Sequence, residues 1–305
     1  MTRRDFIKKS CMIMWGLGWS NLFRNKRDLF LAEGKNVEEK KSKIVIANGE
    51  NFEEITIKVV EKLGGIEKFV KKGEKVVIKP NIAFNKTPQQ GANTHPDVVS
   101  ALVKLCKNTG AKEIVVIDHP PGSGSWNVTY LTSGIKDAVE KAGGIMKPPT
   151  NWKKVEINGT EILKEAEILQ EVIDCDVLIN IPVVKVHVGS KVTLAMKNFM
   201  GIVKDRRYFH RTNLHKCIAE ITYFIKPKTR LIILDATRIM LTNGPQGPGE
   251  IKELKTVIGG TDIVALDAYG TTLLGKKPEE VPHIKIASEM GLGVMDLEKV
   301  DIHYV

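Results

Sequence analysis

Short runs of β-branched and aliphatic residues alternate with longer amphipathic stretches along this chain from about residue 43 onward. The runs predict strands at 44–47, 75–78, 113–117, 177–181, 231–234, 256–258 and 300–304. The stretches between them predict helices at 52–63, 96–109, 128–142, 193–200, 214–225, 263–274 and 278–290. Strands that alternate with helices in this way are joined by crossovers, so we expect an α/β fold with a mostly parallel sheet flanked by helices.

The number of domains is left open by this alternation. A chain of 305 residues can bury its core as one elaborate domain or as two small ones. A stretch at 147–154 that contains Pro, Asn and Trp divides the expected α/β region, 43–305, into halves at 43–150 and 151–305. One continuous sheet is equally compatible with the pattern. With 27% charged residues and a mean hydropathy of -0.12, the composition excludes a disordered chain and a polytopic membrane protein.

Residues 1–32 have the layout of a targeting segment, and a polar linker at 33–42 follows them. Arg3, Arg4 and Phe6 precede a short apolar run at 11–19, and this arrangement resembles a twin-arginine export signal. The resemblance implies the twin-arginine translocation machinery as a partner and an exported, periplasmic or otherwise extracytoplasmic location. The segment is either a cleaved signal peptide or an uncleaved N-terminal anchor, and we expect membrane contact only through it.

The positive charge of the chain divides into two unlike parts. The formal net charge is +10, and residues 1–32, with seven basic and two acidic side chains, carry half of it. The remaining body is therefore close to balanced. Because a basic stripe is the electrostatic signature of nucleic-acid binding, and no zinc-finger, RNP or helix-turn-helix pattern is present, we expect no nucleic-acid partner.

Four of the predicted strands end directly in charged or amide side chains. These side chains are Lys79 and Asn81, Asp118, Lys185 and His187, and Asp235. In an open parallel sheet, ligands bind outside the carboxyl ends of the strands, so we expect these residues to converge on one crevice. The alternative is that each strand simply leaves the core through polar residues.

The densest group of polar residues lies between residues 180 and 215. Lys185 and His187 are two apart and point to the same side of an extended backbone. Further candidates for ligand binding follow in the order Lys197, Asn198, Arg206, Arg207 and His210, just before a helix that we expect to open near residue 212. A helix N-terminus and neighbouring basic groups favour an anion, so the segment predicts a site for a phosphate- or carboxylate-bearing ligand. A solvated basic loop at 204–211 is the alternative.

Candidate catalytic residues come from the same set. His187 is the candidate acid/base, because an ordinary histidine pKa of about 6.5 suits proton transfer near neutrality, and Lys185 and Asp235 are the other catalytic candidates. The sequence does not identify a cofactor. Asp118 and Asp235 are candidate ligands for a divalent metal, since carboxylate oxygens suit such ions. The cysteines beyond residue 32 lack Cys-x-x-Cys spacing and favour buried free thiols.

Five segments together resemble the domain-of-unknown-function family 362: residues 79–84, 94–99, 180–203, 234–237 and 243–249. The central block, with its Lys-x-His, Thr-x-x-x-Lys-Asn and Met-Gly elements, is the most specific of them. The resemblance covers roughly residues 43–300 and implies a fold and a site rather than an activity. Many relatives are described as iron-sulfur proteins because they carry a ferredoxin-like segment. This sequence has no such iron-sulfur ligand motif, so a four-iron four-sulfur cluster is not carried over.

Three functions remain as hypotheses. The first is an exported enzyme that acts on a small anionic metabolite by proton transfer, isomerisation or metal-assisted hydrolysis. The second is a non-catalytic binding protein that captures an anionic ligand or a redox cofactor. The third, which rests on the family resemblance alone, is an accessory partner of a separate iron-sulfur protein. Whether the protein is an enzyme is left open by the sequence.

The export hypothesis predicts the effect of one double substitution. Changing Arg3 and Arg4 together to Lys should leave the protein in the cytoplasm of its host, because the receptor of this route reads the arginine pair. Fractionation followed by immunoblotting measures the outcome. Export at the original level in the double variant would contradict the assignment.

Overall fold

The structure is a computed structural model that describes residues 42–121 and 125–305. These residues form one compact unit. The expected export signal, with Arg3, Arg4 and Phe6, lies outside the described residues, as does almost all of the expected linker. Among the helices of the described part, none has the length and apolar character needed to cross a bilayer.

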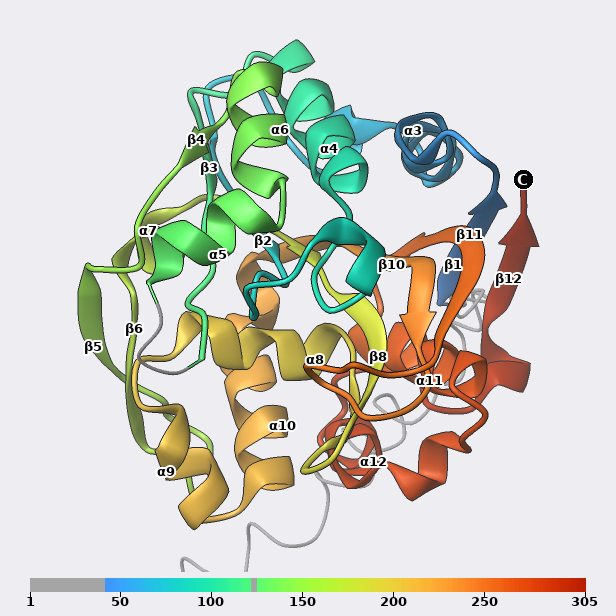
Figure 1. Ribbon diagram of the computed structural model, residues 1–305. Helices are drawn as coiled ribbons and strands as arrows, with labels where there is room; N and C mark the ends of the chain where they lie inside the picture. Colours follow the sequence, from blue (N-terminus) through green and yellow to red (C-terminus); the bar gives the residue numbers. More distant parts are fainter. Residues whose placement is uncertain (1–41, 122–124) are drawn as a thin grey trace, which may run out of the picture. The chain divides into compact units, whose positions relative to one another are not determined.

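A ten-stranded sheet runs through the middle of the molecule (Figure 1). Its strands are β1 (Lys43–Asn48), β2 (Lys75–Pro80), β3 (Glu113–Val116), β4 (Ile145–Met146), β7 (Val177–Ile181), β8 (Val183–His187), β9 (Lys191–Thr193), β10 (Thr229–Met240), β11 (Ile251–Gly260) and β12 (Asp301–Tyr304). The order is β12-β1-β11-β10-β7-β2-β3-β4, and β8 pairs with both β10 and β9. Only β11 and β9 pair antiparallel with their neighbours in this sheet, which confirms the expected mostly parallel α/β fold.

Helices cover both faces of the sheet. Their bounds are α3 (Phe52–Lys62), α4 (Pro96–Asn108), α5 (Trp126–Thr132), α6 (Ile135–Ala142), α7 (Gln170–Asp174), α8 (Ala195–Asn198), α9 (Arg206–Arg211), α10 (Leu214–Ile225), α11 (Ile263–Leu273) and α12 (Pro282–Glu289). In Figure 1, α3, α4 and α6 lie toward the top of the view and α8 to α12 toward the bottom, and α5 packs on the same core as α4 and α6. Each face has its own apolar core, because strand side chains alternate between the two faces.

Strands from both expected halves lie side by side in the one large sheet, with β7 between β10 and β2. A separate two-stranded sheet of β5 (Trp152–Glu156) and β6 (Glu165–Leu169) begins within the stretch that was expected to divide them. The sequence pattern missed this pair, as well as β4, β8 and β9. None of these strands contains more than two consecutive apolar residues, and β8 starts immediately after Pro182, so their apolar runs are too brief to stand out.

Three expected helices have clearly different bounds in the structure. The stretch at 278–290 forms a 3-10 turn at Pro278–Glu280 and then α12 from Pro282. The stretch at 128–142 is divided into α5 and α6, because Gly134 has a φ of +72° and ends the first helical run. The helix expected from residue 193 begins at Ala195, since β9 continues to Thr193. The buried carboxylate of Asp267 accepts hydrogen bonds from the backbone N–H groups of Ala195 (2.7 Å) and Met196 (3.0 Å). Asp267 thereby fixes the start of α8.

The register of the central strands places the polar residues at one end of the sheet. Lys79 on β2 is the neighbour of Asn180 on β7, and Asp235 on β10 is the neighbour of Val183 at the start of β8. Thr94 ties β2 to β7: its hydroxyl accepts from Asn81 N (2.8 Å) and donates to the Ile181 carbonyl oxygen (2.7 Å). The carboxyl ends of these parallel strands therefore share one edge.

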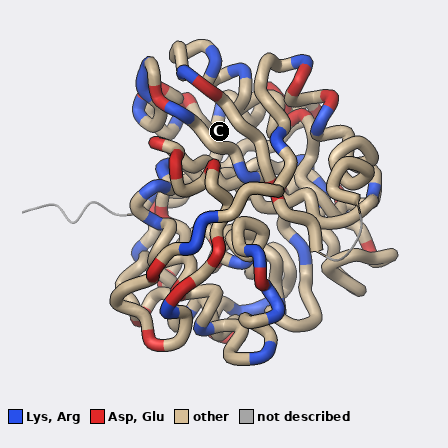
Figure 2. The backbone as a smooth tube through the Cα atoms, turned by 90° about the vertical axis from the view of Figure 1, so that its left-hand side faces the viewer, with Lys and Arg blue, Asp and Glu red and all other residues tan. Residues whose placement is uncertain are grey.

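Charged residues of both signs are distributed around the folded body. Figure 2 shows Lys and Arg interspersed with Asp and Glu on the face that it draws. Many of them form exposed ion pairs, such as Lys104 with Glu53 at 2.6 Å and Lys154 with Glu165 at 2.8 Å. Exposed pairs of this kind contribute little to stability, about 0–1 kcal/mol each. The charges that bear on function are the buried ones.

Candidate functional site

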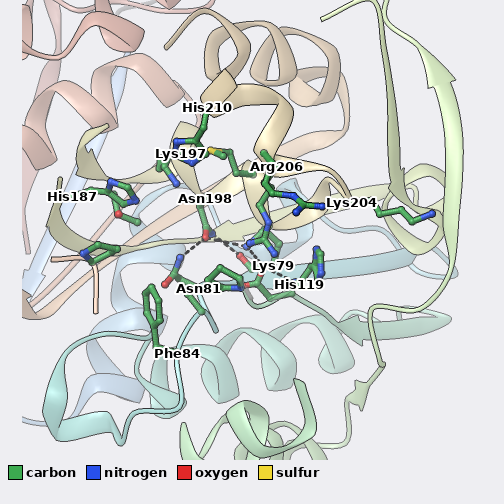
Figure 3. A pocket seen from close by; sticks show the side chains of 18 of the residues that line it. Lys79, Asn81, Phe84, His119, His187, Lys197, Asn198, Lys204, Arg206 and His210 are labelled. Atoms are coloured by element: carbon green, nitrogen blue, oxygen red, sulfur yellow. Dashed lines mark hydrogen bonds and ion pairs between the residues drawn. The ribbon is translucent and has the colours of Figure 1, made fainter. Parts of the chain in front are cut away.

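A cavity of about 870 Å³ lies at the carboxyl ends of β2, β3 and β8 (Figure 3). Ten of the residues that the sequence singled out line it: Lys79, Asn81, Asp118, Lys185, His187, Lys197, Asn198, Arg206, Arg207 and His210. Asp235 is the predicted site residue of the folded body that does not line it. The structure thus brings together residues that are up to 131 positions apart in the sequence.

Asn198 is the centre of the hydrogen-bond network at the floor of the cavity. Its side-chain oxygen accepts from Lys79 Nζ and from Asn81 Nδ2, both at 3.0 Å. Its Nδ2 donates to the Lys79 carbonyl oxygen (3.2 Å) and to Asn180 Oδ1 (2.8 Å). The side chain is buried, and these four bonds use its full capacity. Asn198 therefore joins α8 to β2 and β7 and has no donor left for a ligand.

Lys79 and Asp118 form a buried ion pair beside Asn198. Lys79 Nζ lies 2.7 Å from Asp118 Oδ1 and also donates to the Pro80 carbonyl oxygen at 2.8 Å. With the bond to Asn198, all three N–H groups of the ammonium have protein partners. Burial lowers the pKa of Lys79, and the Asp118 carboxylate opposes that effect. Lys79 was expected to hold the anion; the geometry gives it a positioning role instead.

Asp118 is equally engaged by the protein. Its Oδ1 accepts from His119 N (2.9 Å) as well as from Lys79, and its Oδ2 accepts from Ile82 N (2.7 Å). Tyr130 donates its hydroxyl to the Asp118 carbonyl oxygen at 2.5 Å. The Asp118 side chain therefore fixes the loops that follow β2 and β3.

Gly201 packs directly on this ion pair. It belongs to the 3-10 helix Phe199–Ile202 that follows α8, and its carbonyl oxygen accepts from His119 N at 3.0 Å. A Cβ atom at this position would overlap Asp118 Oδ1 and would lie 2.8 Å from Lys79 Nζ. No side chain fits between the backbone and the two charges, which explains the glycine of the Met-Gly element.

The β8–β9 hairpin carries a second set of polar groups into the cavity. Lys185 and Thr193 are direct register partners on the two strands, and His187 follows Lys185 by two residues, so all three face the same side. Lys185 Nζ donates to Asn81 Oδ1 (3.1 Å) and to the Ala92 carbonyl oxygen, and it lies 5.0 Å from the centre of the Phe84 ring. Burial and the positive charge of Lys197 lower the pKa of Lys185 to about 7.

Lys197 is a cation of the cavity whose ammonium group is free to bind a ligand. It is half-buried, and within the described residues it has neither a hydrogen-bond partner nor an ion-pair partner for its ammonium group. Burial, together with Arg206 and Lys79, lowers its pKa to about 8. The Thr193 hydroxyl, which sequence reasoning missed, is also buried without a partner and lines the same cavity. Its position opposite Lys185 became evident only once the β8–β9 pairing was known.

His187 is held in one tautomer by the turn of the hairpin. Its Nδ1 accepts hydrogen bonds from Gly189 N (3.0 Å) and Ser190 N (3.2 Å), so Nδ1 carries no proton and the neutral ring has its proton on Nε2. Burial, with Lys197 and Lys185 nearby, lowers the pKa of His187 to about 3. The ordinary histidine pKa on which the acid/base prediction relied does not apply here. In this form the ring offers a hydrogen-bond donor.

The basic residues before α10 form a helix of their own, α9, rather than a loop. Asp205 begins it by accepting from the backbone N–H groups of Arg207 (3.1 Å) and Tyr208 (3.3 Å). Arg206 donates through Nη2 to the Pro120 carbonyl oxygen at 2.8 Å, and burial lowers its pKa. The opening of α10 near residue 212 was expected to bind the anion. Asn213 caps that helix, and neither residue 212 nor Asn213 lines the cavity.

The two aspartates that were predicted to hold a metal are in different surroundings. Asp235 is buried outside the cavity lining, where its Oδ2 accepts from His95 N (2.6 Å) and its Oδ1 from the Thr237 hydroxyl (2.6 Å). Among residues 42–121 and 125–305, no group of three or more His, Cys, Asp and Glu side chains is placed to hold a metal ion. The divalent metal therefore stays a prediction from the sequence.

The loop at 243–249 contributes to the cavity through its backbone path. Pro245 lines the cavity, and a Cβ atom on Gly244 would overlap the Val186 carbonyl oxygen, so the loop lies directly against β8. This close approach explains a glycine at 244 and constrains the path of the loop beside the site.

Comparison with known proteins gives a family match and distant structural likenesses. The family model described as "Domain of unknown function (DUF362)" matches residues 76–272. A thylakoid-associated protein of Synechocystis sp. is 27% identical over 248 residues, which cover 77% of this chain and 73% of that protein.

Among solved structures, the chain is similar to the lactate racemase apoprotein from Thermoanaerobacterium thermosaccharolyticum, with a TM-score of 0.48 and 13% identity over 79% of this chain and 57% of that one. A protein from Thermotoga maritima matches with a TM-score of 0.43 and 13% identity over 79% of this chain and 60% of that one. The chain spans less than two thirds of the length of either structure.

The packing of Gly201 on the ion pair predicts a destabilised variant. Gly201→Ala should lower the free energy of unfolding by about 1–3 kcal/mol, because the added methyl group forces Lys79 and Asp118 apart. Urea unfolding measures the loss. Gly189→Ala is the matched control: its Cβ would lie 3.5 Å from Leu214, an ordinary contact, so we expect a change within about 0.5 kcal/mol. Equal stability of the two variants would contradict the close packing at Gly201.

Proposed function

The chain belongs to the domain-of-unknown-function family 362, and from the geometry of its cavity we propose that it binds a small ligand through a phosphate or carboxylate group. The proposed binding groups are the ammonium groups of Lys185 and Lys197, the Nε2–H group of His187 and the hydroxyl of Thr193. All four side chains line the same cavity, and its size falls in the range of small-molecule sites, about 300–1,000 Å³.

The observation that carries this proposal is the pair of lysines without counter-charges. In the described part of the chain, no carboxylate lies within ion-pair distance of Lys185 or of Lys197. Removing two ammonium groups from water without a counter-charge is unfavourable, which is why the pKa values of both are lowered. A bound anion supplies the missing negative charge and accepts their hydrogen bonds.

The geometry of His187 supports binding more directly than proton transfer. Nε2 cannot act as a base while it holds the proton that the two Nδ1 hydrogen bonds impose on it. A neutral ring that donates from Nε2 complements an anionic oxygen. The catalytic roles of His187, Lys185 and Asp235 stay predictions, and a non-catalytic binding protein, with or without a redox partner, remains the second candidate function.

The location of this binding is a separate proposal that rests on the sequence alone. We propose that residues 1–32 direct the folded body out of the cytoplasm, so that the ligand is met in the periplasm or another extracytoplasmic space. Export of this kind and anion binding are independent of each other, and either can hold without the other.

Removing the ammonium group of Lys197 should weaken anion binding. Lys197→Met is expected to lower the affinity of the full-length protein for its anion by roughly tenfold or more, since hydrogen bonds to charged groups contribute about 1.5–3 kcal/mol. Calorimetric titrations with inorganic phosphate and with acetate measure this loss and distinguish a phosphate site from a carboxylate site.

The matched control is Lys58→Met, which removes an exposed lysine of α3 that pairs with Glu54 and does not line the cavity. Its affinity should equal that of the unaltered protein. Undiminished affinity in Lys197→Met, or binding of neither anion by the unaltered protein, would refute the proposed site.

The lowered pKa values predict the direction of the pH dependence. With pKa values of about 7 for Lys185 and about 8 for Lys197, both lysines are charged below pH 7 and lose their protons as the pH rises through these values. Anion affinity should therefore fall between about pH 6.5 and 9, by up to about tenfold per pH unit for each lysine that deprotonates. Titration with sulfate, whose charge is constant over this range, measures the effect. An affinity that is constant or rises with pH would contradict the role of the lysines.

A further inference from the structure

The cavity holds more positive charge than one phosphate or carboxylate group neutralises. Six of its lining side chains are Lys or Arg, and three are Asp or Glu. Each of the three carboxylates is already in an ion pair: Asp118 with Lys79, Glu167 with Lys204, and Asp205 with Arg211. Within the described residues, the lining cations without an ion-pair partner are Lys185, Lys197, Arg206 and Arg207.

These four cations form two pairs on different elements. Lys185 and Lys197 belong to the β8–β9 hairpin and to α8, whereas Arg206 and Arg207 are the first two residues of α9. Figure 3 shows Arg206 and His187 on opposite sides of Asn198. Arg206 is near enough to Lys197 to lower its pKa, so the two pairs belong to one continuous cavity.

The floor of the cavity is largely satisfied within the protein. Asn198 makes four hydrogen bonds within the protein, and the ammonium of Lys79 makes three interactions. Uncharged side chains, among them Met200 and Phe84, also line the cavity. The cations without ion-pair partners are therefore the groups that can neutralise a ligand's charges.

We propose that the ligand carries two separate anionic groups joined by an uncharged spacer, an inference that rests on the proposed function. One group binds Lys185 and Lys197 with the Nε2–H group of His187, and the other binds the guanidinium groups of Arg206 and Arg207. The planar fork of an arginine suits phosphate and carboxylate oxygens alike. A cavity of about 870 Å³ leaves room for the spacer, which a single phosphate or carboxylate group would leave unfilled.

Alkane bisphosphonates with spacers of two to eight methylene groups test the proposal against alkane monophosphonates of the same lengths. Calorimetric titration of the full-length protein at pH 6.5 compares their affinities. We expect one spacer length to bind roughly 100-fold more tightly than its monophosphonate, because the second contact is then intramolecular. Arg206→Met should remove most of this advantage, whereas the affinity for the monophosphonate, held at the lysine pair, should fall by much less than the affinity for the bisphosphonate.

Two further variants keep the test interpretable. Arg230→Met removes an arginine that pairs with Glu74 outside the cavity lining, and it should keep the full advantage of the bisphosphonate. Arg207→Met removes the exposed member of the proposed pair and reduces the advantage even if Arg206→Met fails to fold.

The outcomes separate this inference from the proposed function. Equal affinity for bisphosphonates and monophosphonates at every spacer length, with both weakened by Lys197→Met, would overturn the two-group ligand and leave the proposed anion site intact. Binding of neither class by the unaltered protein would overturn both. A bisphosphonate advantage that survives Arg206→Met and Arg207→Met would overturn the assignment of the second group to α9.

Discussion

The arrangement of the cavity depends on one buried ion pair, between Lys79 at the end of β2 and Asp118 after β3. Its two charges are almost inaccessible to water, so each must find its hydrogen bonds within the protein. They find them in Asn198, in the backbone of Ile82 and in the backbone of His119, groups from three separate segments. A shift of any one of these segments would leave a buried charge without a partner, and this requirement holds the floor of the cavity in a single arrangement.

The polar groups on the floor of the cavity hydrogen-bond to one another, and this decides which other polar groups can bind a ligand. Lys79, Asn81 and Asn198 satisfy one another, so they contribute to function by holding α8 and the β8–β9 hairpin in position. The groups with unused donors lie above the floor, on elements that the floor supports. The site therefore combines a rigid, internally neutralised base with a set of cations that lack counter-charges. Such a division lets the cations remain in place before the ligand arrives.

The sequence predicts which residues lie at the site more accurately than it predicts the role of each residue. Strand ends are visible as apolar runs that stop at polar residues, and the carboxyl ends of parallel strands must meet, so residues such as Lys79, Asp118 and Lys185 could be placed in one crevice in advance. Whether a lysine is saturated or available depends on neighbours more than a hundred residues away, such as Asn198 for Lys79. The hairpin that places the buried Thr193 at the cavity, and the separation of Asp235 from the cavity, follow from strand pairings that leave no clear pattern in the sequence.

The Thr-x-x-x-Lys-Asn element supplies both a residue of the buried hydrogen-bond network and a cation that is free to bind a ligand. Thr193 ends β9 and faces the cavity, and α8 begins two residues later because Asp267 accepts its first backbone N–H groups. Successive residues of a helix are rotated by about 100°, so the adjacent Lys197 and Asn198 must point in different directions. Asn198 turns to the sheet and completes the buried network, and Lys197 is left facing the cavity with its charge unpaired. The rigid floor and the available cation thus come from neighbouring positions of a single turn, and the orientation of the cation is fixed by the same bonds that saturate the floor.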